Sequence, residues 1–552
     1  MKETDRIWLE SYPPGVPAEV DVDTYSSLAA LFDECCERYA DKPAYVSMGR
    51  TLKFSELHEK ARRFAAFLQS RTALEPGDRV AVMLPNTLQY PVALFGILSA
   101  GMTVVNTNPL YKTRELSRQL EDSGARAVIV LENFAHVVES ALGGTQVETV
   151  VVTGLGDLLG GIKGPVTNFV VRHVKRMVRD WNIPGSVRFR DALTTEEDFQ
   201  RVSVDSGDLA FLQYTGGTTG VSKGAMLTHR NMVANIEQSA VWLTRAMEEG
   251  KEVLITALPL YHVFALTANC LVFMKIGGCN VLITNPRDMK TFVKTMKGVK
   301  FSGITGVNTL FNALLNAPGF TDLDFSRLKL SLGGGMAVQR AVAERWKRIT
   351  GCTLLEAWGL TETAPAACIN PPDLEDYNGS IGLPIPSTEL SIQDEKGNQL
   401  AVGEIGELCV RGPQVMKGYW NRPEETAAVL SDDGWLRTGD MGRMDERGYV
   451  YIVDRKKDMI NVSGFNVFPN EIEDVLAAHP GILEAGVVGV PDEHSGEAVK
   501  AVVVKRDPGL TERQVIDYCR RELTGYKVPR KVEFRDELPK SNVGKILRRE
   551  LR

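Results

Sequence analysis

Residues 214–224 read Tyr214-Thr215-Gly216-Gly217-Thr218-Thr219-Gly220-Val221-Ser222-Lys223-Gly224 and follow the apolar run Leu209 to Leu212. Glycines let backbone N–H groups approach an anion closely, hydroxyls add donors, and a lysine supplies a point charge. The stretch therefore predicts a loop that wraps a polyphosphate after a strand. It is not the P-loop of ordinary nucleotidases, because Ser222 and Gly224 flank Lys223 where that loop has a glycine and a hydroxyl.

Helical and β-rich segments alternate along most of the chain. Thr228 offers an N-cap before the helical stretch 231–236. The alternation predicts a large N-terminal domain of layered α/β structure with parallel sheets. Amphipathic helices are expected at 28–38 and 56–69, and strands at 79–84 and 127–131.

The pattern changes after the charged segment Asp454-Arg455-Lys456-Lys457-Asp458. The remaining C-terminal segments predict a compact α+β unit of roughly a hundred residues. We therefore expect two domains, residues 1–456 and a small mobile domain of residues 457–552, joined at a charged hinge. In the small domain, helices are expected at 470–478 and 511–523, and strands at 484–490, 498–504 and 531–535.

Composition indicates a large enzyme of a reducing compartment. A chain of 552 residues forms two or more domains with a sizeable core. Its net charge of −6 gives no argument for nucleic acid as a partner. Eight scattered cysteines without a C-x-x-C pair favour free thiols over disulfides or a zinc site, and Cys35 and Cys36 are expected on the buried side of a helix.

No integral membrane segment is expected. The N-terminus carries no secretory signature. The longest uncharged run, 83–111, is interrupted by asparagines, glycines and a proline, so it is typical of a strand, a turn and a helix rather than of a membrane span. The sequence therefore favours a cytoplasmic protein.

Five further motifs come after the glycine-rich loop. In chain order they are Trp358-Gly359-Leu360-Thr361-Glu362-Thr363, Trp435-Leu436-Arg437-Thr438-Gly439-Asp440, Asp454-Arg455-Lys456-Lys457-Asp458-Met459-Ile460, the run from Val462 to Glu473, and Leu538-Pro539-Lys540-Ser541-Asn542-Val543-Gly544-Lys545. Together with the loop they resemble the adenylate-forming enzymes, most closely the bacterial long-chain fatty-acyl-CoA synthetases. The resemblance covers essentially the whole chain. It implies the adenylate-forming fold and a ligase that uses ATP, Mg²⁺ and coenzyme A.

The first motif suits the activation of a carboxylate. Attack of a carboxylate on the α-phosphate of ATP gives an acyl-adenylate, so Mg²⁺, the triphosphate and the carboxylate must be held in line. By resemblance, Glu362 binds Mg²⁺ and Thr361 donates to the α-phosphate. Trp358, next to Gly359, is expected to stack on adenine. The alternatives are a solvated loop carboxylate for Glu362 and a core aromatic for Trp358.

Other positions are assigned to the nucleotide in the same way. Asp440 is suited to accept hydrogen bonds from the ribose hydroxyls, with an Asx-turn residue as the alternative. Arg455 reaches the nucleotide from the hinge, and Lys545 neutralises charge on the α-phosphate during adenylation. The run Gly333-Gly334-Gly335 is expected to let the base lie against the backbone, although three glycines alone are a weak signal.

The hinge links the two half-reactions. In the family the small domain rotates after the adenylate has formed and presents its opposite face to coenzyme A. Lys457 matches the pivot. Gly464 is expected beside the pantetheine thiol, where the absence of a Cβ gives room. The alternative is a charged linker without a switching role.

The acyl substrate is read from the segment 259–266. Relatives that activate amino acids usually carry an aspartate here, and this segment has none, which favours a neutral hydrophobic tail. His262 either lines the carboxylate end of the acyl pocket or is a packed, hydrogen-bonded histidine. Leu266, Leu271 and Phe273 face either the acyl tunnel or the core, and the core is favoured.

A cationic amphipathic segment at 163–181 points to the anionic inner face of the cytoplasmic membrane, with a helix packed on the large domain as the alternative. Its apolar residues at helical spacing are Val166, Phe169, Val170, Val174, Met177, Val178 and Trp181, and its cations are Lys163, Arg172, Lys175, Arg176 and Arg179.

These features predict a peripheral, cytoplasmic ligase that joins a long-chain fatty acid to coenzyme A through an acyl-AMP. A ligase for medium-chain or aryl acids and a fatty acyl-AMP ligase are the alternatives within the family. A non-catalytic lipid-binding protein is disfavoured by the presence of Glu362, Asp440 and Lys545. A homodimer is compatible with the sequence.

Overall fold

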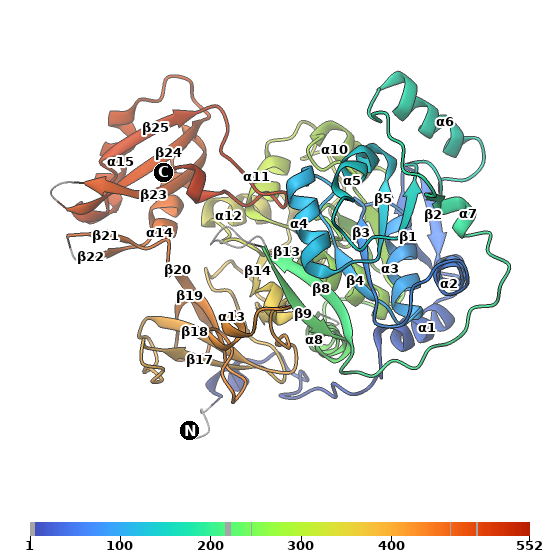
Figure 1. Ribbon diagram of the computed structural model, residues 1–552. Helices are drawn as coiled ribbons and strands as arrows, with labels where there is room; N and C mark the ends of the chain where they lie inside the picture. The colour runs from blue at the N-terminus through green and yellow to red at the C-terminus, as the bar shows by residue number, and fades with distance from the viewer. Residues whose placement is uncertain (1–5, 216–221, 244, 464, 493–494) are drawn as a thin grey trace.

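Two large sheets, a smaller antiparallel sheet and a separate C-terminal domain make up the molecule (Figure 1). The computed structural model describes residues 6–215, 222–243, 245–463, 465–492 and 495–552. This architecture confirms the predicted fold class, a large layered α/β domain followed by a small α+β domain.

One large sheet is parallel except at the edge that carries the glycine-rich loop. Its last two strands, β8 and β9, pair antiparallel, and the loop 216–221, whose residues lie outside the described part of the chain, connects them. In spatial order the strands are β7 (Val187–Arg188), β6 (Thr149–Thr153), β5 (Ala127–Leu131), β3 (Arg79–Met83), β4 (Thr103–Asn106), β8 (Leu209–Thr215) and β9 (Lys223–Thr228).

The second large sheet has a parallel centre and antiparallel strands at both ends. In spatial order its strands are β16 (Leu383–Pro384), β15 (Ala366–Ile369), β14 (Leu354–Gly359), β13 (Leu330–Gly333), β12 (Gly303–Gly306), β10 (Val253–Thr256), β11 (Cys279–Leu282), β1 (Pro43–Ser47) and β2 (Arg50–Lys53).

The central strands of these sheets are buried on both faces, whereas the edge strands β2 and β7 are partly exposed. In β3, Val80 and Val82 join the main core while Ala81 and Met83 join the core on the opposite face, as the two-residue period of a strand requires. Helices that contribute to the main core are α1 (Leu28–Arg38), α2 (Phe54–Ser70), α3 (Gln89–Ser99), η4 (Ala265–Leu271), α9 (Val272–Lys275), α7 (Phe189–Ala192) and α8 (His229–Leu243); those of the outer cores are α4 (Thr113–Ser123), α5 (Ala135–Ala141), α10 (Met289–Lys297), α11 (Asn308–Leu315) and α12 (Arg340–Thr350).

Local signals in this domain are confirmed. The Thr228 hydroxyl accepts from the Asn231 amide at 3.1 Å and the Asn231 side chain accepts from the Thr228 amide at 3.0 Å, so Thr228 caps α8. The run 83–111 folds as the end of β3, α3 and β4. Cys35 and Cys36 are buried on α1. All eight cysteines are free, and burial raises the pKa of every one of these thiols.

A four-stranded antiparallel sheet follows the large sheets, and the sequence pattern did not predict it. It positions two residues of the candidate site, because Asp440 lies in β19 and Arg455 ends β20. The strands are β17 (Glu389–Gln393), β18 (Gly406–Arg411), β19 (Leu436–Met444) and β20 (Val450–Arg455), and the short helix α13 (Pro423–Ala427) lies between β18 and β19.

The C-terminal domain lies beside the large domain and joins it through β20, at the left of Figure 1. Both predicted helices and all three predicted strands are present, with the pair β21 and β22 in addition. Its elements are β21 (Ile460–Val462), β22 (Phe465–Val467), α14 (Pro469–Ala477), β23 (Ile482–Asp492), β24 (Gly496–Lys505), α15 (Glu512–Glu522) and β25 (Lys531–Arg535).

A short helical projection stands out at the upper right of Figure 1, formed by α6 (Lys163–Phe169) and η3 (Val170–Val174). The helical spacing predicted up to Trp181 is wrong beyond Val174. Arg176 has φ of +51°, outside helical geometry, and Trp181 packs against the core beyond the helix. None of the helices in the described residues is long and apolar enough to cross a membrane.

Candidate active site

A cleft of about 1970 Å³ lies between the large domain and the C-terminal domain. It receives side chains from β8, β14, β19 and β20 and from the lysine loop of the C-terminal domain, residues 538–545. Sequence-predicted residues in its lining are Tyr214, Ser222, His262, Gly335, Trp358, Gly359, Asp440, Arg455, Lys457 and Lys545; Thr215, Lys223, Gly224, Gly333, Gly334, Thr361 and Glu362 are outside that lining.

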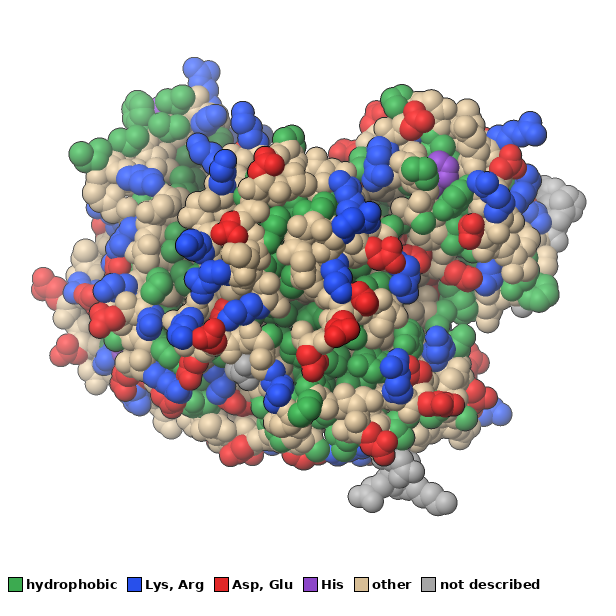
Figure 2. Space-filling view, turned by 180° about the vertical axis from the view of Figure 1, so that it is seen from behind, with side chains coloured by type: hydrophobic (Ala, Val, Ile, Leu, Met, Phe, Trp, Pro, Cys, Tyr) green, Lys and Arg blue, Asp and Glu red, His purple; other side chains and the backbone are tan. Residues whose placement is uncertain are grey.

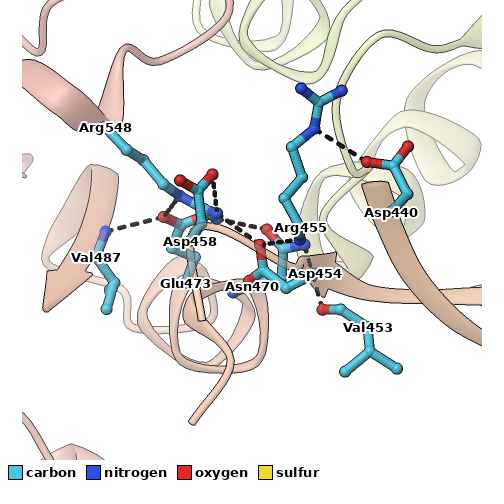
Figure 3. Close-up of polar contacts among 9 residues, drawn as sticks. All are labelled: Asp440, Val453, Asp454, Arg455, Asp458, Asn470, Glu473, Val487 and Arg548. Carbon is cyan, nitrogen blue, oxygen red and sulfur yellow. Dashed lines mark hydrogen bonds and ion pairs between the residues drawn. The ribbon is translucent and has the colours of Figure 1, made fainter. Parts of the chain in front are cut away.

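Asp440 stands at the centre of a polar group in this cleft. The Trp358 indole N–H donates to its Oδ2 at 2.9 Å, and Arg455 Nε pairs with its Oδ1 at 3.0 Å (Figure 3). The carboxylate is buried. An ionised carboxylate has about four acceptor positions, so both oxygens retain room for further donors.

Lys545 enters the same cleft from the opposite domain. The Ser541 hydroxyl accepts from the Lys545 amide at 3.1 Å and so shapes the loop that presents the lysine. Burial, and then the charge of Arg455, lower the pKa of Lys545 to about 8. An anion bound beside Lys545 would stabilise the charged form of the lysine, so this ammonium group suits a polyanionic ligand.

Backbone and side-chain contacts hold the small domain in this orientation. The Thr309 hydroxyl donates to the Gly544 carbonyl at 2.8 Å, and the Asn312 amide donates to the Leu483 carbonyl at 3.0 Å. Both donors lie on α11 of the large domain. The lysine loop is thus fixed against the large domain next to the cleft.

An ion-pair cluster crosses the hinge (Figure 3). Arg548 forms a bidentate pair with Glu473 at 3.0 and 2.7 Å and donates to Asp454 Oδ1 at 2.8 Å. Asp454, 1% exposed, precedes the hinge, whereas Arg548 and Glu473 follow it. Burial alone would lower the pKa of Arg548, but Glu473 and Asp454 raise it. The pair Arg548–Asp454 therefore ties the end of the chain to the last strand before the hinge.

The flanks of the glycine-rich loop lie beside the cleft. The Tyr214 phenol donates to Asp122 Oδ2 at 2.7 Å, and the Ser222 hydroxyl donates to the Thr215 carbonyl. Lys223 pairs with Glu425 of α13. The loop residues themselves, Gly216, Gly217, Thr218, Thr219, Gly220 and Val221, lie outside the described residues, as does Gly464.

Glu362 and Thr361 lie on the turn η5 (Thr361–Thr363), which packs against β8 and β9. The Tyr419 phenol donates to Glu362 Oε1 at 2.6 Å. No donor from the described residues reaches Oε2. A partly exposed carboxylate is a ligand of the kind that Mg²⁺ prefers, and η5 packs against the two strands that flank the glycine-rich loop, so Glu362 fits the predicted metal.

The glycines near the cleft serve close packing. A Cβ on Gly359 would lie 1.8 Å from the Pro365 carbonyl oxygen, and one on Gly333 would lie 2.6 Å from Val338. Gly335 has φ of +76° and lines the cleft. Gly334 lies next to the ring of Phe264, which a Cβ there would approach to 3.1 Å. Their contact with the base stays a prediction.

His262 faces the cleft near Lys545. Burial, and then the charge of Lys545, lower its pKa to about 4, and its Nδ1 accepts from the Phe264 amide at 3.3 Å. The imidazole is therefore neutral and carries its proton on Nε2. Leu266, Leu271 and Phe273 are buried in the main core, as the favoured alternative predicted.

The sequence analysis missed four residues of this region. Asp122, Tyr419 and Glu425 contact predicted site residues, and Arg548 anchors the lysine loop. Tyr419 stands in the run Gly418-Tyr419-Trp420, whose aromatic pair after a glycine was the available signal. The other three are charged residues in charged surroundings, and nothing in the sequence distinguishes them.

Comparisons with known proteins show the family to which the chain is similar. Residues 32–420 match the model of the AMP-binding enzyme family, and residues 471–545 match that of the AMP-binding enzyme C-terminal domain. The chain is 59% identical over 549 residues to the long-chain-fatty-acid–CoA ligase of Salmonella typhimurium (strain LT2), covering 99% of this chain and 98% of the relative.

Two solved structures are similar over nearly the whole length. ATP-bound MatB from Rhodopseudomonas palustris has a TM-score of 0.81 and 31% identity, with 95% of this chain and 98% of that chain covered. The anthranilate CoA ligase AuaEII in complex with anthranoyl-AMP has a TM-score of 0.86 and 25% identity, with 96% and 98% covered.

The hinge cluster yields a stability prediction. Arg548→Met leaves Glu473 and Asp454 without their cation, which we expect to destabilise the C-terminal domain by about 3–5 kcal/mol. Hydrogen exchange of the α14 and β23 amides measures this loss of stability, because exchange reports the opening free energy of each region separately. The control is Arg549→Met, whose side chain is exposed and should change protection little. Equal protection in both variants would contradict the structural role of the cluster.

Proposed function

This chain belongs to the AMP-binding enzyme family, and we infer from that membership that it is a long-chain-fatty-acid–CoA ligase. It activates a fatty acid with ATP to an acyl-AMP and pyrophosphate, and then transfers the acyl group to coenzyme A with release of AMP. The match to a ligase of that name over 99% of the chain carries this conclusion. The predicted enzyme class is thereby confirmed.

We propose that Lys545 and Arg455 stabilise the first half-reaction. Attack on the α-phosphate builds negative charge on that phosphate and on the bridging oxygen, and preorganised cations in an enclosed cleft offset such charge strongly. Support comes from the position of Lys545, which shares the cleft with Arg455 and Asp440 although its loop belongs to the other domain. Thr361 is assigned to the α-phosphate as a donor.

The nucleotide is assigned to the same polar group. Asp440 has acceptor positions left for the ribose hydroxyls after its bonds to Trp358 and Arg455. Trp358 and Gly335 are assigned to the base, and the glycine-rich loop to the β- and γ-phosphates. Lys223 would exchange its pair with Glu425 for a phosphate, because the charge of a triphosphate exceeds that of one carboxylate.

Glu362 is the residue that we assign to Mg²⁺, through Oε2. When bound, the ion neutralises charge on the phosphates. Mg²⁺ usually takes one or two protein carboxylates together with substrate phosphates and water, so a single carboxylate at the phosphate loop is sufficient.

For the second half-reaction we propose rotation of residues 457–552 about Lys457. Lys457 lies between the end of β20 at Arg455 and the start of β21 at Ile460, where no strand pairing restrains the backbone. Rotation would withdraw Lys545 and bring Gly464 to the cleft for coenzyme A. It would also have to break the Arg548–Asp454 pair, which spans the pivot.

The acyl chain is assigned to the apolar side of the cleft near His262. A neutral imidazole and the absence of a carboxylate in 259–266 suit an uncharged tail beyond the reacting carboxylate. The segment gives no acidic partner for an ammonium group, which disfavours amino acids as substrates.

We also propose that the segment 162–179, which contains the helical projection, rests on an anionic lipid surface at the inner face of the cytoplasmic membrane. It presents Ile162 and Phe169, 83% and 60% exposed, together with the exposed side chains of Val166, Val174 and Met177. Figure 2 shows these hydrophobic side chains at upper left, with basic side chains beside them.

Charge supports lipid as the occupant. The segment 162–179 contains five cations and no carboxylate, and Lys175, Arg176 and Arg179 are exposed. Arg172, by contrast, pairs with the buried Glu132 and is engaged within the protein. Long-chain fatty acids partition into bilayers, so binding of this cationic, apolar surface to lipid would bring the enzyme to its substrate.

The ligase assignment predicts which substrates are required for turnover. AMP release should need both a fatty acid and coenzyme A for multiple turnovers, and should be fastest with long chains. The measurement is a coupled AMP assay over acids from short to very long chain, with aryl acids included. Faster turnover of aryl or medium-chain acids, or turnover independent of coenzyme A, would favour the alternatives of the family.

Rotation about the pivot predicts a separation of the half-reactions. Lys545→Ala should lose pyrophosphate exchange and retain conversion of supplied acyl-AMP to acyl-CoA, whereas Lys457→Pro should do the opposite, because proline fixes φ near about −65°. The matched control is Lys457→Ala, which removes the side chain without restricting φ. Lys456→Pro is unsuitable as a control, because the Lys456 amide donates to the Gly439 carbonyl and proline would remove that hydrogen bond. Loss of both steps in Lys545→Ala would refute the two-orientation account.

Lipid binding predicts an effect of charge reversal. Lys175→Glu, Arg176→Glu and Arg179→Glu together should weaken sedimentation with vesicles of anionic lipid by about 1 kcal/mol per residue. Turnover of a water-soluble acid should change little. The matched control reverses Arg513, Arg520 and Arg521 on α15 of the other domain. Unchanged sedimentation of the first variant would leave the projection as a surface helix.

A further inference from the structure

Tyr419 contacts both charged residues assigned to the metal–triphosphate. Its phenol donates to Glu362 Oε1 at 2.6 Å, and the Lys223 ammonium lies 5.0 Å from the centre of its ring. The side chain is 8% exposed. Tyr419 therefore stands between a carboxylate and a lysine that come from different parts of the chain.

The backbone around Tyr419 is fixed on several sides. The Tyr419 amide donates to the Thr426 hydroxyl at 2.9 Å, and Tyr419 forms a backbone bridge with Ala225 of β9. The Met416 amide donates to the Glu362 carbonyl at 2.8 Å. The segment 416–420 thus joins η5 to β9, and Tyr419 has little freedom to leave Glu362.

The bond from Tyr419 to Glu362 is of the strong kind. A phenol that donates to a carboxylate at 2.6 Å lies in the range of charge-assisted hydrogen bonds. The phenol is the donor of this bond, because a carboxylate oxygen can only accept. It occupies Oε1 and leaves Oε2 without a donor from the described residues.

We propose that Tyr419 is a positioning residue for the first half-reaction. Its hydroxyl fixes the Glu362 carboxylate by one oxygen so that the other is available to Mg²⁺. Carboxylates that bind metals are themselves commonly oriented by an outer hydrogen bond, and loss of that bond typically lowers metal affinity or activity by about 10–100-fold. This inference rests on the proposed role of Glu362.

The aromatic ring and the hydroxyl of Tyr419 make different contacts, so their roles can be tested separately. Lys223 lies over the face of the ring and also pairs with Glu425. Substitution by phenylalanine keeps the ring for Lys223 and removes only the hydroxyl. Tyr419→Phe is therefore a specific test of the bond to Glu362.

We expect Tyr419→Phe to raise the Mg²⁺ concentration for half-maximal ATP binding about tenfold, at the low end of the effect of an outer hydrogen bond. Binding of ATP in EDTA should be unchanged, because the hydroxyl acts only through the metal ligand. Titration calorimetry of ATP at stepped Mg²⁺ concentrations measures both. Conversion of supplied acyl-AMP to acyl-CoA should also be unchanged.

The matched control is Tyr12→Phe, which removes a phenol hydrogen bond of the same 2.6 Å length, to the Pro384 carbonyl, away from the cleft. It should leave the Mg²⁺ requirement unaltered. Melting temperatures of the two variants show any general loss of stability. A lower melting temperature in Tyr419→Phe with unchanged ATP affinity in EDTA would mean that the folded variant still binds the nucleotide normally without metal.

Glu362→Gln separates the inference from its premise. If Glu362→Gln loses the Mg²⁺ dependence of ATP binding and Tyr419→Phe retains the wild-type dependence, Glu362 binds the metal and the inference about Tyr419 is wrong. If neither variant changes that dependence, the assignment of Glu362 fails as well. A weaker binding of ATP in EDTA by Tyr419→Phe would instead assign the residue to the nucleotide itself.

Discussion

The pairing of Arg548 across the hinge is the constraint on which the site depends. A largely buried guanidinium must be matched by carboxylates, and Glu473 from its own domain and Asp454 from the strand before the hinge meet that need. Because Arg548 follows Lys545 by three residues, the position that satisfies it also brings the lysine to the cleft. One electrostatic requirement thus couples the orientation of a domain to the placement of the lysine that we assign to the first half-reaction.

The layered fold explains why distant residues meet there. Strands of both large sheets end at the cleft, among them β4, β8, β13 and β14, so residues at and after their carboxyl ends, such as Tyr214 of β8 and Trp358 of β14, line one surface. This is the usual place for ligands in open α/β sheets. The antiparallel sheet adds Asp440 and Arg455 from the side, and so connects the candidate nucleotide site to the hinge.

Periodic segments were predictable from sequence, because their signal is local. Helix α1 and strands β5 and β25 have the predicted bounds, and Thr228 caps α8 as expected. Pairings between distant residues were not predictable: no pattern relates Tyr419 to Glu362, or Arg172 to Glu132. The amphipathic spacing continued past Val174 although the helix ends there, since apolar residues also recur where a chain turns back onto a core.

The burial of the cysteines has a chemical consequence for an enzyme of this kind. An acyl-adenylate acylates thiolates readily, and coenzyme A must be the thiol that receives the acyl group. None of the eight cysteines lines the cleft, seven of them are buried, and burial raises the pKa of each, so the protein's own thiols stay protonated and away from the cleft. The fold in this way protects the enzyme from labelling itself with its own intermediate.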